Sequence, residues 1–380
     1  MSTKRTRREI LRTTALGSVT ALVASRMAFA ADEKAKPGKQ KNLLILGGTG
    51  FLGPHLVEAA KASGWTITLF NRGKTRPTLF PELTKLQGDR DTGDYKSLEG
   101  KKFDAVIDPS GYWPRHVRQA AAAVGNDIGL YVFISSISVY PDNSKPNMDE
   151  TAAVGTISEA DAEKMATKKD ITESNYGPLK AACEAANTKA YGKRALNIRP
   201  GYIVGPGDGS DRFTYWPVRA AKGGEMLAPG TPKDPIQIID VRDLAEWTIR
   251  MVDAKAAGEY NATGPKTELT MGAVLDSCKK MSKSDVTFTW VSAAVLKEQK
   301  LDPPIWAAPD GESAGFHRVS IKRALAKGLT FRPLDTTVAD TLTYWNGLPE
   351  ERKAKPRAFV DPAKEAEVLA LVKTAKKPAA

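Results

Sequence analysis

The stretch Asn42-Leu43-Leu44-Ile45-Leu46-Gly47-Gly48-Thr49-Gly50-Phe51-Leu52-Gly53 decides how this chain of 380 residues folds. Its apolar first half is typical of a buried parallel strand, which the glycines end. Residues 51–63 then have a helical pattern that Gly64 ends. The glycine spacing suits a turn that binds a dinucleotide. The first glycine allows a tight bend, the second lets the backbone approach a pyrophosphate, and the third lets helix and strand pack closely.

We therefore expect this turn to hold a dinucleotide cofactor. A glycine turn without a ligand is the alternative, and the strand before it and the helix after it argue against that reading. The residues expected to contact the cofactor here are Gly47, Gly50, Phe51, Leu52 and Gly53.

Short apolar runs alternate with helical patterns in the rest of this region. The expected strands that follow are 66–70, 103–108, 130–135 and 195–199, and the expected later helices are 115–124 and 176–191. This alternation favours right-handed βαβ units, and therefore an α/β fold with a Rossmann-like, doubly wound parallel sheet.

The composition of the sequence changes after Pro206, and the regular alternation of strand and helix patterns stops. We expect a dinucleotide-binding domain over residues 41–206, completed by 236–262, where a strand and a helix return. A smaller C-terminal substrate lobe is expected from 207–235, which is rich in glycine, proline and charge, and from 263–347. A C-terminal tail over 348–380 follows, with a surface helix at 362–373.

The first thirty residues have the pattern of an export signal. The twin arginines Arg7-Arg8 precede a mildly apolar segment at 13–25, and Ala28-Phe29-Ala30 offers a cleavage site of small residues. The low hydrophobicity and Arg26 favour the twin-arginine (Tat) route. We expect a periplasmic or exported protein with a linker over 31–40 and no stable membrane insertion after cleavage. A basic tail that is never cleaved is the alternative.

Composition excludes some classes of site. The chain has only two cysteines, Cys183 and Cys278, and three histidines, so we expect neither a disulfide framework nor a metal site. The net charge of +12 suits an anionic ligand such as a dinucleotide, a sugar nucleotide or RNA, or a solvated lysine-rich surface.

Three further residues have the chemistry of proton transfer. Ser136 follows the expected strand 130–135, while Tyr176 and Lys180 are four residues apart and so share one face of the expected helix 176–191. We expect the Lys180 ammonium to lower the pKa of Tyr176 and to reach the nicotinamide ribose. Tyr176 would then exchange a proton with a substrate hydroxyl or carbonyl, whose oxygen Ser136 would hydrogen-bond.

The end of the second strand bears on which dinucleotide binds. NAD sites place an acidic residue here against the ribose hydroxyls, whereas this chain has Asn71, followed by Arg72 and Lys74. The two cations suit a 2′-phosphate, so the cofactor is NADP or NAD with NADP favoured; solvated cations are the alternative. Residues 88–90 are expected to end a further strand between 66–70 and 103–108, and Asp89 there is expected to accept from the adenine amino group or to form a turn.

These motifs resemble the extended short-chain dehydrogenases/reductases, the NAD-dependent epimerase/dehydratase family. The resemblance runs from Lys41 to about Trp345, and its anchors are residues 47–53, 135–140, 176–180 and 199–208. It implies Ser136, Tyr176 and Lys180 as catalytic residues and a stretch beside the nicotinamide that contains Tyr202 and Ile203. It also implies a homodimer. The residues suggested for substrate binding are Ser138, Arg212 and Arg318.

Three functions follow from these observations. The first is an NAD(P)-dependent epimerase or dehydratase that acts on a sugar or sugar nucleotide with a tightly bound cofactor. The second is an NADP-dependent reductase or dehydrogenase of a carbonyl substrate. The third is a non-catalytic dinucleotide- or RNA-binding protein, because residues 69–74 and 88–90 are similar to chloroplast stem-loop RNA-binding relatives of the family. The intact Tyr176 and Lys180 pair argues against a nucleic-acid partner.

Overall fold

The computed structural model describes residues 41–165 and 167–375. The export signal and linker expected over residues 1–40 lie outside this range, as do the last five residues of the tail. Among the helices that the structure describes, none combines the length and the apolar character needed to cross a bilayer.

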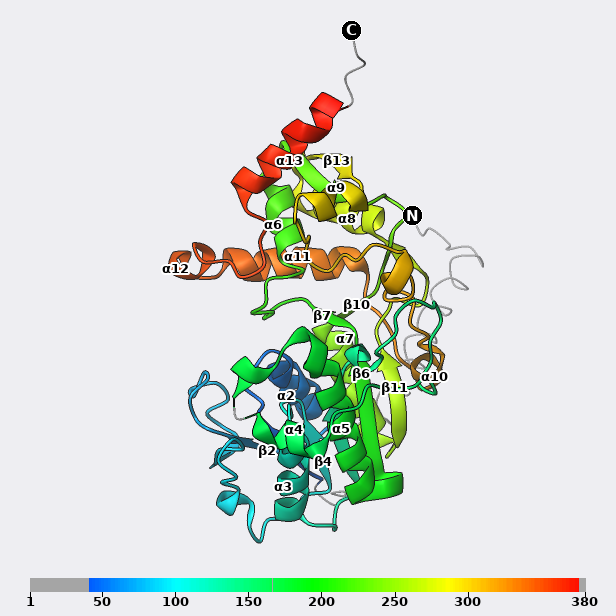
Figure 1. Ribbon diagram of the computed structural model, residues 1–380. Coiled ribbons are helices and arrows are strands. Elements are labelled where there is room, and N and C mark those ends of the chain that lie inside the picture. Colours follow the sequence, from blue (N-terminus) through cyan, green and yellow to red (C-terminus); the bar gives the residue numbers. More distant parts are fainter. Residues whose placement is uncertain (1–40, 166, 376–380) are drawn as a thin grey trace, which may run out of the picture. The chain divides into compact units, whose positions relative to one another are not determined.

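Seven strands of the described residues form one parallel sheet in the order β11-β6-β5-β4-β1-β2-β3 (Figure 1). The expected Rossmann-like, doubly wound fold is therefore confirmed. The strands are β1 (Asn42–Leu46), β2 (Thr66–Asn71), β3 (Thr84–Gln87), β4 (Ala105–Asp108), β5 (Leu130–Ile134), β6 (Ala195–Pro200) and β11 (Gly258–Ala262).

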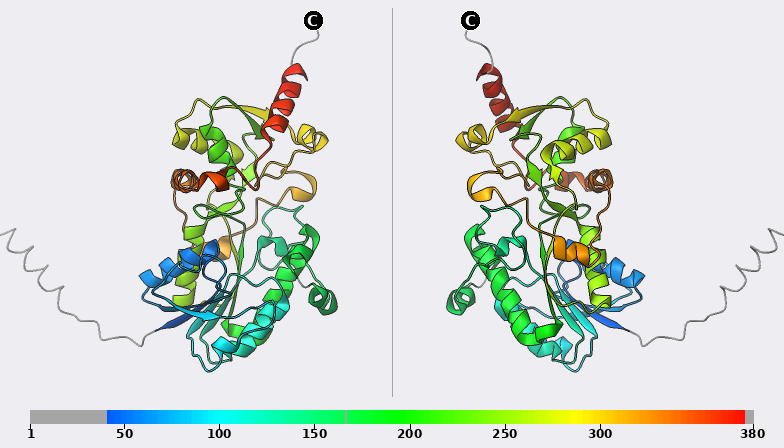
Figure 2. Two further views of the ribbon diagram at one scale, coloured as in Figure 1. Left: turned by 90° about the vertical axis from the view of Figure 1, so that its left-hand side faces the viewer. Right: turned by 90° about the vertical axis from the view of Figure 1, so that its right-hand side faces the viewer.

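Helices cover both faces of this sheet, and β1 shows why. Leu43 and Ile45 belong to one apolar core, whereas Leu44 and Leu46 belong to another on the opposite face. Helices α2 (Leu52–Ala62) and α7 (Val241–Asp253) complete the first core, and α3 (Pro114–Val124) and α5 (Glu173–Tyr191) complete the second. Figure 2 shows the strands between these two helical layers.

A separate apolar core lies beyond the carboxyl edge of the sheet. Its members come from residues 204–238 and 271–360, and helix α13 packs against β8 beside it. The helices there are α6 (Tyr215–Ala221), α8 (Met271–Ser282), α9 (Ala293–Glu298), α11 (Leu334–Asn346), α12 (Glu350–Lys353) and α13 (Pro362–Ala375).

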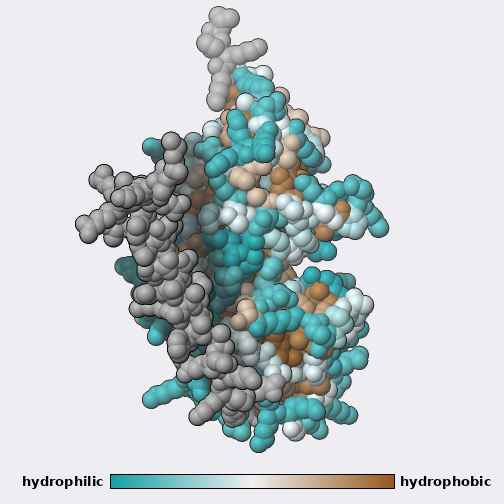
Figure 3. All heavy atoms as spheres, turned by 180° about the vertical axis from the view of Figure 1, so that it is seen from behind, coloured by the Kyte–Doolittle hydropathy of each residue, from teal (hydrophilic) through white to brown (hydrophobic). Residues whose placement is uncertain are grey.

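Short strand pairs accompany this second core. β7 (Tyr202–Val204) pairs with β10 (Ile238–Asp240), β8 (Glu225–Pro229) with β13 (Thr287–Val291), and β9 (Pro235–Ile236) with β12 (Leu269–Thr270). The remaining helices are α4 (Glu159–Lys164) and α10 (Lys322–Ala326), with 3₁₀ turns η1 (Lys96–Leu98), η2 (Ile137–Val139), η3 (Lys168–Asp170), η4 (Gly192–Arg194) and η5 (Gly311–Ser313). The face turned away in Figure 1 is largely hydrophilic where it is not covered by grey atoms (Figure 3).

Helix α5 begins three residues earlier than the sequence pattern indicates. The Asn175 side chain accepts a hydrogen bond from the backbone N–H of Thr172 at 2.8 Å, which caps the first turn. The early start places Tyr176 in the first turn of α5. There the backbone of Gly177 lies so close to η2 that an added Cβ would collide with the carbonyl oxygen of Ser138.

We predict that Gly177→Ala destabilises the protein, although alanine is the better helix former. Overpacking against η2 should lower the free energy of unfolding by about 1–3 kcal/mol. Urea denaturation measures this value. Ala185→Gly, at an exposed position of the same helix, is the control and should lose only about 1 kcal/mol. A more stable Gly177→Ala variant would show that the close contact is absent.

Candidate active site

Three adjoining cavities follow the carboxyl edge of the sheet. The first, here called the Arg72 cavity, has a volume of about 220 Å³ and is lined by the glycine turn, the end of β2 and residues 88–91. The central cavity, of about 330 Å³, is lined by the glycine turn, Tyr176 and Lys180. The Ser136 cavity, of about 260 Å³, is lined by residues that include Ser136, Tyr176 and Asp208.

Shared residues make these cavities one continuous groove. Gly47, Gly50 and Ser110 line both the Arg72 cavity and the central cavity. Phe51, Tyr176 and Ile203 line both the central cavity and the Ser136 cavity. The groove therefore runs from the end of β2, over the glycine turn, to the Tyr176 side chain, which is the course that a dinucleotide takes across such a sheet.

The glycine turn is held from two sides. Gly47 has a φ of +126°, and its N–H donates to the carbonyl of Phe70 at 2.8 Å. Asn71 Nδ2 donates to the carbonyl of Gly47 at 3.2 Å, and Arg76 Nε donates to the carbonyl of Thr49 at 2.9 Å. A Cβ added to Gly50 would have no neighbour within 4 Å. The turn is thus fixed in place and open above Gly50, as the close approach of a pyrophosphate requires.

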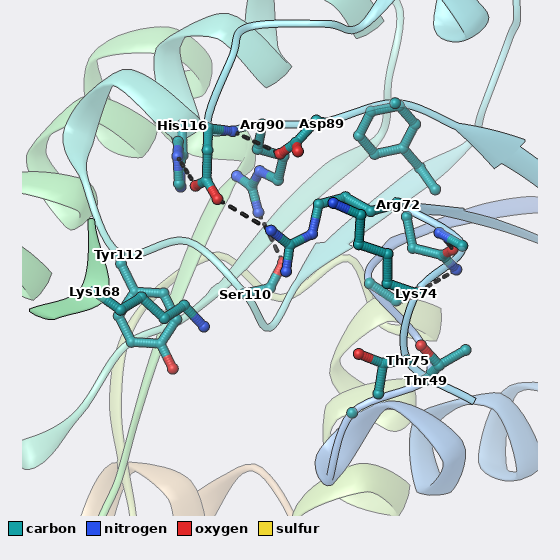
Figure 4. A pocket seen from close by; sticks show the side chains of 17 residues that line it. Thr49, Arg72, Lys74, Thr75, Asp89, Arg90, Ser110, Tyr112, His116 and Lys168 are labelled. Atoms are coloured by element: carbon teal, nitrogen blue, oxygen red, sulfur yellow. Dashed lines mark hydrogen bonds and ion pairs between the residues drawn. The ribbon is translucent and has the colours of Figure 1, made fainter. Parts of the chain in front are cut away.

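The Arg72 cavity contains the residues expected to decide between NAD and NADP (Figure 4). Asn71, Arg72, Lys74 and Asp89 all line it. Arg72 is exposed, and its Nη1 lies 3.3 Å from Asp91 Oδ2. Asp89 Oδ1 accepts the backbone N–H of Asp91 at 3.1 Å, so this side chain forms a turn, which was the alternative to adenine binding.

The same cavity contains residues that sequence reasoning missed. Lys168 and Tyr112 line it, with the Lys168 ammonium 4.1 Å from the centre of the Tyr112 ring. His116 lies beside them, and burial together with the charge of Arg90 lowers its pKa to about 3. Arg90 itself is buried and makes a bidentate pair with Asp108. No periodicity or spacing marks these residues, because only the fold brings them together.

Ser136 and Tyr176 meet in the Ser136 cavity. Ser136 caps η2 by accepting the N–H of Ser138 at 3.1 Å, and the two hydroxyls are 3.0 Å apart. Burial raises the pKa of Tyr176, while its hydrogen bond with Ser136 and the nearby Arg212 charge partly oppose that rise. Four residues that were singled out from the sequence, Ser136, Ser138, Tyr176 and Arg212, therefore line one cavity.

Lys180 has a different electrostatic role from the expected one. Its Nζ donates to the carbonyl oxygens of Ile134 at 2.6 Å and Gly111 at 3.0 Å, and it lies 4.3 Å from the ring of Phe133. Burial lowers the pKa of Lys180. The expectation that Lys180 lowers the pKa of Tyr176 is therefore wrong for this structure, because two carbonyls hold the ammonium and the phenol pKa is raised.

The remaining expected residues divide into two groups. Tyr202 and Ile203 line the Ser136 cavity, and the Arg212 guanidinium lies 4.9 Å from the centre of the Tyr202 ring. Arg318 does not line any of the three cavities. Its Nε bonds Glu268 at 2.9 Å in another depression of the surface. Within the described residues, no group of His, Cys, Asp or Glu side chains is placed to hold a metal ion.

We predict that Lys180→Ala lowers the free energy of unfolding by about 1–3 kcal/mol, because two buried carbonyls lose their donor. Tyr176→Phe, which removes one hydroxyl from the same helix, should cost less than about 1 kcal/mol. Urea denaturation of both variants compares the two costs. Equal stability of the Lys180→Ala variant and the unchanged protein would contradict the observed bonding.

Comparison with known proteins agrees with this geometry. The model of the NAD dependent epimerase/dehydratase family matches residues 43–263. The chloroplast stem-loop binding protein of 41 kDa b from Arabidopsis thaliana is 26% identical over 259 residues, which are 63% of each chain. The present chain thus spans 63% of the length of that relative.

Two solved structures share the fold at low identity. UDP-glucuronic acid 4-epimerase from Bacillus cereus, in complex with NAD, is 14% identical with a TM-score of 0.58, and the match covers 80% of this chain and 98% of that one. The human epimerase family protein SDR39U1 (isoform 2), with NADPH, is 17% identical with a TM-score of 0.54, and the match covers 80% and 99%. Since the family model covers more than half of the sequence, the chain belongs to the NAD-dependent epimerase/dehydratase family.

Proposed function

We propose that this protein is an NAD(P)-dependent oxidoreductase of the epimerase/dehydratase type that acts on a hydroxyl or carbonyl of a sugar or sugar nucleotide. One observation carries the proposal: Tyr176 lines both the cavity that contains the glycine turn and the cavity that contains Ser136. A phenol in that position faces a dinucleotide on one side and a substrate on the other. Its hydroxyl is the acid or base that hydride transfer to an alcohol or carbonyl carbon requires.

Each group in the groove has a separate role in the proposed reaction. The bound dinucleotide supplies the hydride exchange. Ser136 hydrogen-bonds the reacting oxygen, and Tyr176 gives or takes its proton. Because burial raises the pKa of Tyr176, the phenol is neutral near pH 7 and is ready to donate. Lys180 fixes the backbone of Gly111 and Ile134 at the wall of the groove.

A tightly bound cofactor suits this arrangement, since an epimerase or dehydratase returns the hydride within one cycle. Arg72 and Lys74 support NADP, while solved neighbours contain NAD or NADPH. The Bacillus cereus neighbour is named for its action on UDP-glucuronic acid, which supports a sugar-type substrate. The twin arginines at 7–8 support export through the Tat route with the cofactor already in place.

A net NADP-dependent reductase and a binding protein are the two competing functions. The exposed cations of the Arg72 cavity favour the first. The name of the Arabidopsis relative, a stem-loop binding protein, favours the second. A binding protein would not depend on the Tyr176 hydroxyl. The Tyr176→Phe variant therefore distinguishes a binding protein from both kinds of enzyme.

We predict that the purified protein binds NADP+ or NAD+ and that Tyr176→Phe reduces turnover by about 10²- to 10⁴-fold without loss of cofactor binding. The loss follows from removal of the proton donor alone. Isothermal titration calorimetry measures binding. Chromatography of the sugar products measures turnover of an epimerase or dehydratase with sugars and sugar nucleotides, and the absorbance of the reduced nicotinamide measures net reduction or oxidation. A protein that binds neither dinucleotide would refute every enzymatic reading. Unchanged function in Tyr176→Phe would favour the binding protein.

We further predict that replacing both Arg72 and Lys74 by alanine weakens NADP+ binding roughly 10- to 100-fold through loss of charged hydrogen bonds to the 2′-phosphate. NAD+ binding should change less than about threefold. Replacement of the exposed Lys101 and Lys102, which line none of the three cavities, removes the same charge and serves as the control. Equal weakening of both cofactors would exclude 2′-phosphate recognition by this pair.

A further inference from the structure

A buried carboxylate that makes no ion pair with any residue in the described part of the chain lies in the Ser136 cavity. Asp208 follows β7, lines the cavity with Tyr176 and Arg212, and is 4% exposed. Its Oδ1 accepts the backbone N–H of Ser210 at 2.8 Å. Its Oδ2 has no hydrogen-bond partner among the residues that the structure describes.

Neighbouring buried acids show what a structural carboxylate looks like in this protein. Asp211 is held by Arg352 through both oxygens, at 2.6 and 2.7 Å, and also accepts the N–H of Arg357. Glu184 pairs with Arg199 at 2.7 Å. Asp211 thus fastens the loop after β7 to the C-terminal segment, and the loop does not need Asp208 for that purpose.

The isolation of Asp208 has an energetic cost. A buried carboxylate oxygen without a donor is unfavourable by roughly 1–3 kcal/mol or more. Burial raises the pKa of Asp208, although the Ser210 hydrogen bonds and the Arg212 charge oppose this effect. Such a group in a cavity beside a proposed reaction centre is a candidate for a ligand contact.

We propose that Asp208 accepts a hydrogen bond from a second hydroxyl of the substrate and so makes the enzyme selective for polyhydroxylated rings. This inference rests on the proposed function, since it takes the reacting hydroxyl to lie at Tyr176 and Ser136. The cavity volume of about 260 Å³ suits one small ring, because whole-ligand pockets measure roughly 300–1,000 Å³.

The surroundings keep the Asp208 carboxylate in position. The N–H of Ser210 holds Oδ1, and Arg212 Nε bonds the Ser210 hydroxyl at 3.1 Å while its guanidinium lies over Tyr202. A ring bound at Tyr176 through one hydroxyl and at Asp208 through another has fewer possible orientations than a ring bound at Tyr176 alone. A ring with a single hydroxyl would leave Oδ2 buried and unpaired, and a site of this kind rejects such analogues strongly.

The test compares rings of similar size that differ in hydroxyl number: cyclohexanol, the 1,2-, 1,3- and 1,4-cyclohexanediols, myo-inositol, D-glucose and D-glucuronic acid. The protein is loaded with NADP+ or NAD+, and the apparent second-order rate constant for reduction of the bound nicotinamide is measured in a single turnover, which records the first hydride transfer even when a later step returns the hydride. The variants are Asp208→Asn and Asp208→Ser, of which the second can still cap Ser210. Asp302→Asn is the matched control, because Asp302 is exposed, acts on the pKa of Tyr202 and does not line the cavity.

In the unchanged protein, we expect the rate constant for nicotinamide reduction with at least one polyol to exceed that with cyclohexanol by about 100-fold or more. Either Asp208 variant should reduce that preference at least about tenfold, while cyclohexanol oxidation changes less than about threefold and Asp302→Asn behaves as the unchanged protein. Thermal unfolding checks that each variant is folded.

Other results overturn the assignment in distinguishable ways. Tyr176-dependent oxidation of cyclohexanol and polyols at equal rates rejects the role of Asp208 and leaves the proposed function standing. If both Asp208 variants oxidise all substrates more slowly by the same factor, Asp208 has a structural role instead. Dinucleotide binding without oxidation of any ring rejects the polyol substrate, and failure to bind dinucleotide rejects the proposed function itself.

Discussion

The close packing of helix α2 on the glycine turn that follows strand β1 is the constraint on which the rest of the site depends. A Cβ on Gly53 would lie 2.5 Å from the carbonyl carbon of Gly48, so only glycine permits the helix to begin where it does. That start directs the N-terminal amide groups of α2 over the carboxyl edge of the sheet. The groove, the position of Gly50 in its floor and the direction in which Phe51 points all follow from this single approach.

Parallel pairing then places the polar and aromatic side chains that follow the strands at the same edge of the sheet. Ser136 follows β5, Tyr202 and Ile203 follow β6, and all strands of the seven-stranded sheet end on one side. Lys180 joins these parts, because its ammonium binds a carbonyl of β5 and another after β4. The lysine therefore links helix α5 to the sheet through hydrogen bonds, and it also lines the groove.

The sequence predicts the elements of the large sheet well, since buried parallel strands are continuous apolar runs and their helices have a clear period. It predicts the glycine turn, Ser136, Tyr176 and Lys180 for the same reason: each motif is local. The sequence predicts a strand after residue 236, where β10 lies, but it predicts neither β7 and β8 nor the pairings β7–β10 and β8–β13, because these strands are short and join segments far apart in the chain. The sequence also does not identify three residues of the Arg72 cavity, since only tertiary packing brings them together: Tyr112, His116 and Lys168. Arg318 lies outside the three cavities and bonds Glu268, so its expected role in substrate binding stays a prediction.

The pair between Asp211 and Arg352 links positions 141 residues apart. Through it, the loop that borders the Ser136 cavity depends on a segment near the end of the chain that contributes no side chain to that cavity. Shortening this protein from its C-terminus past Arg352 would therefore leave a buried negative charge without its partner beside the groove. Hybrids that exchange the loop between relatives would have to transfer the matching arginine with it.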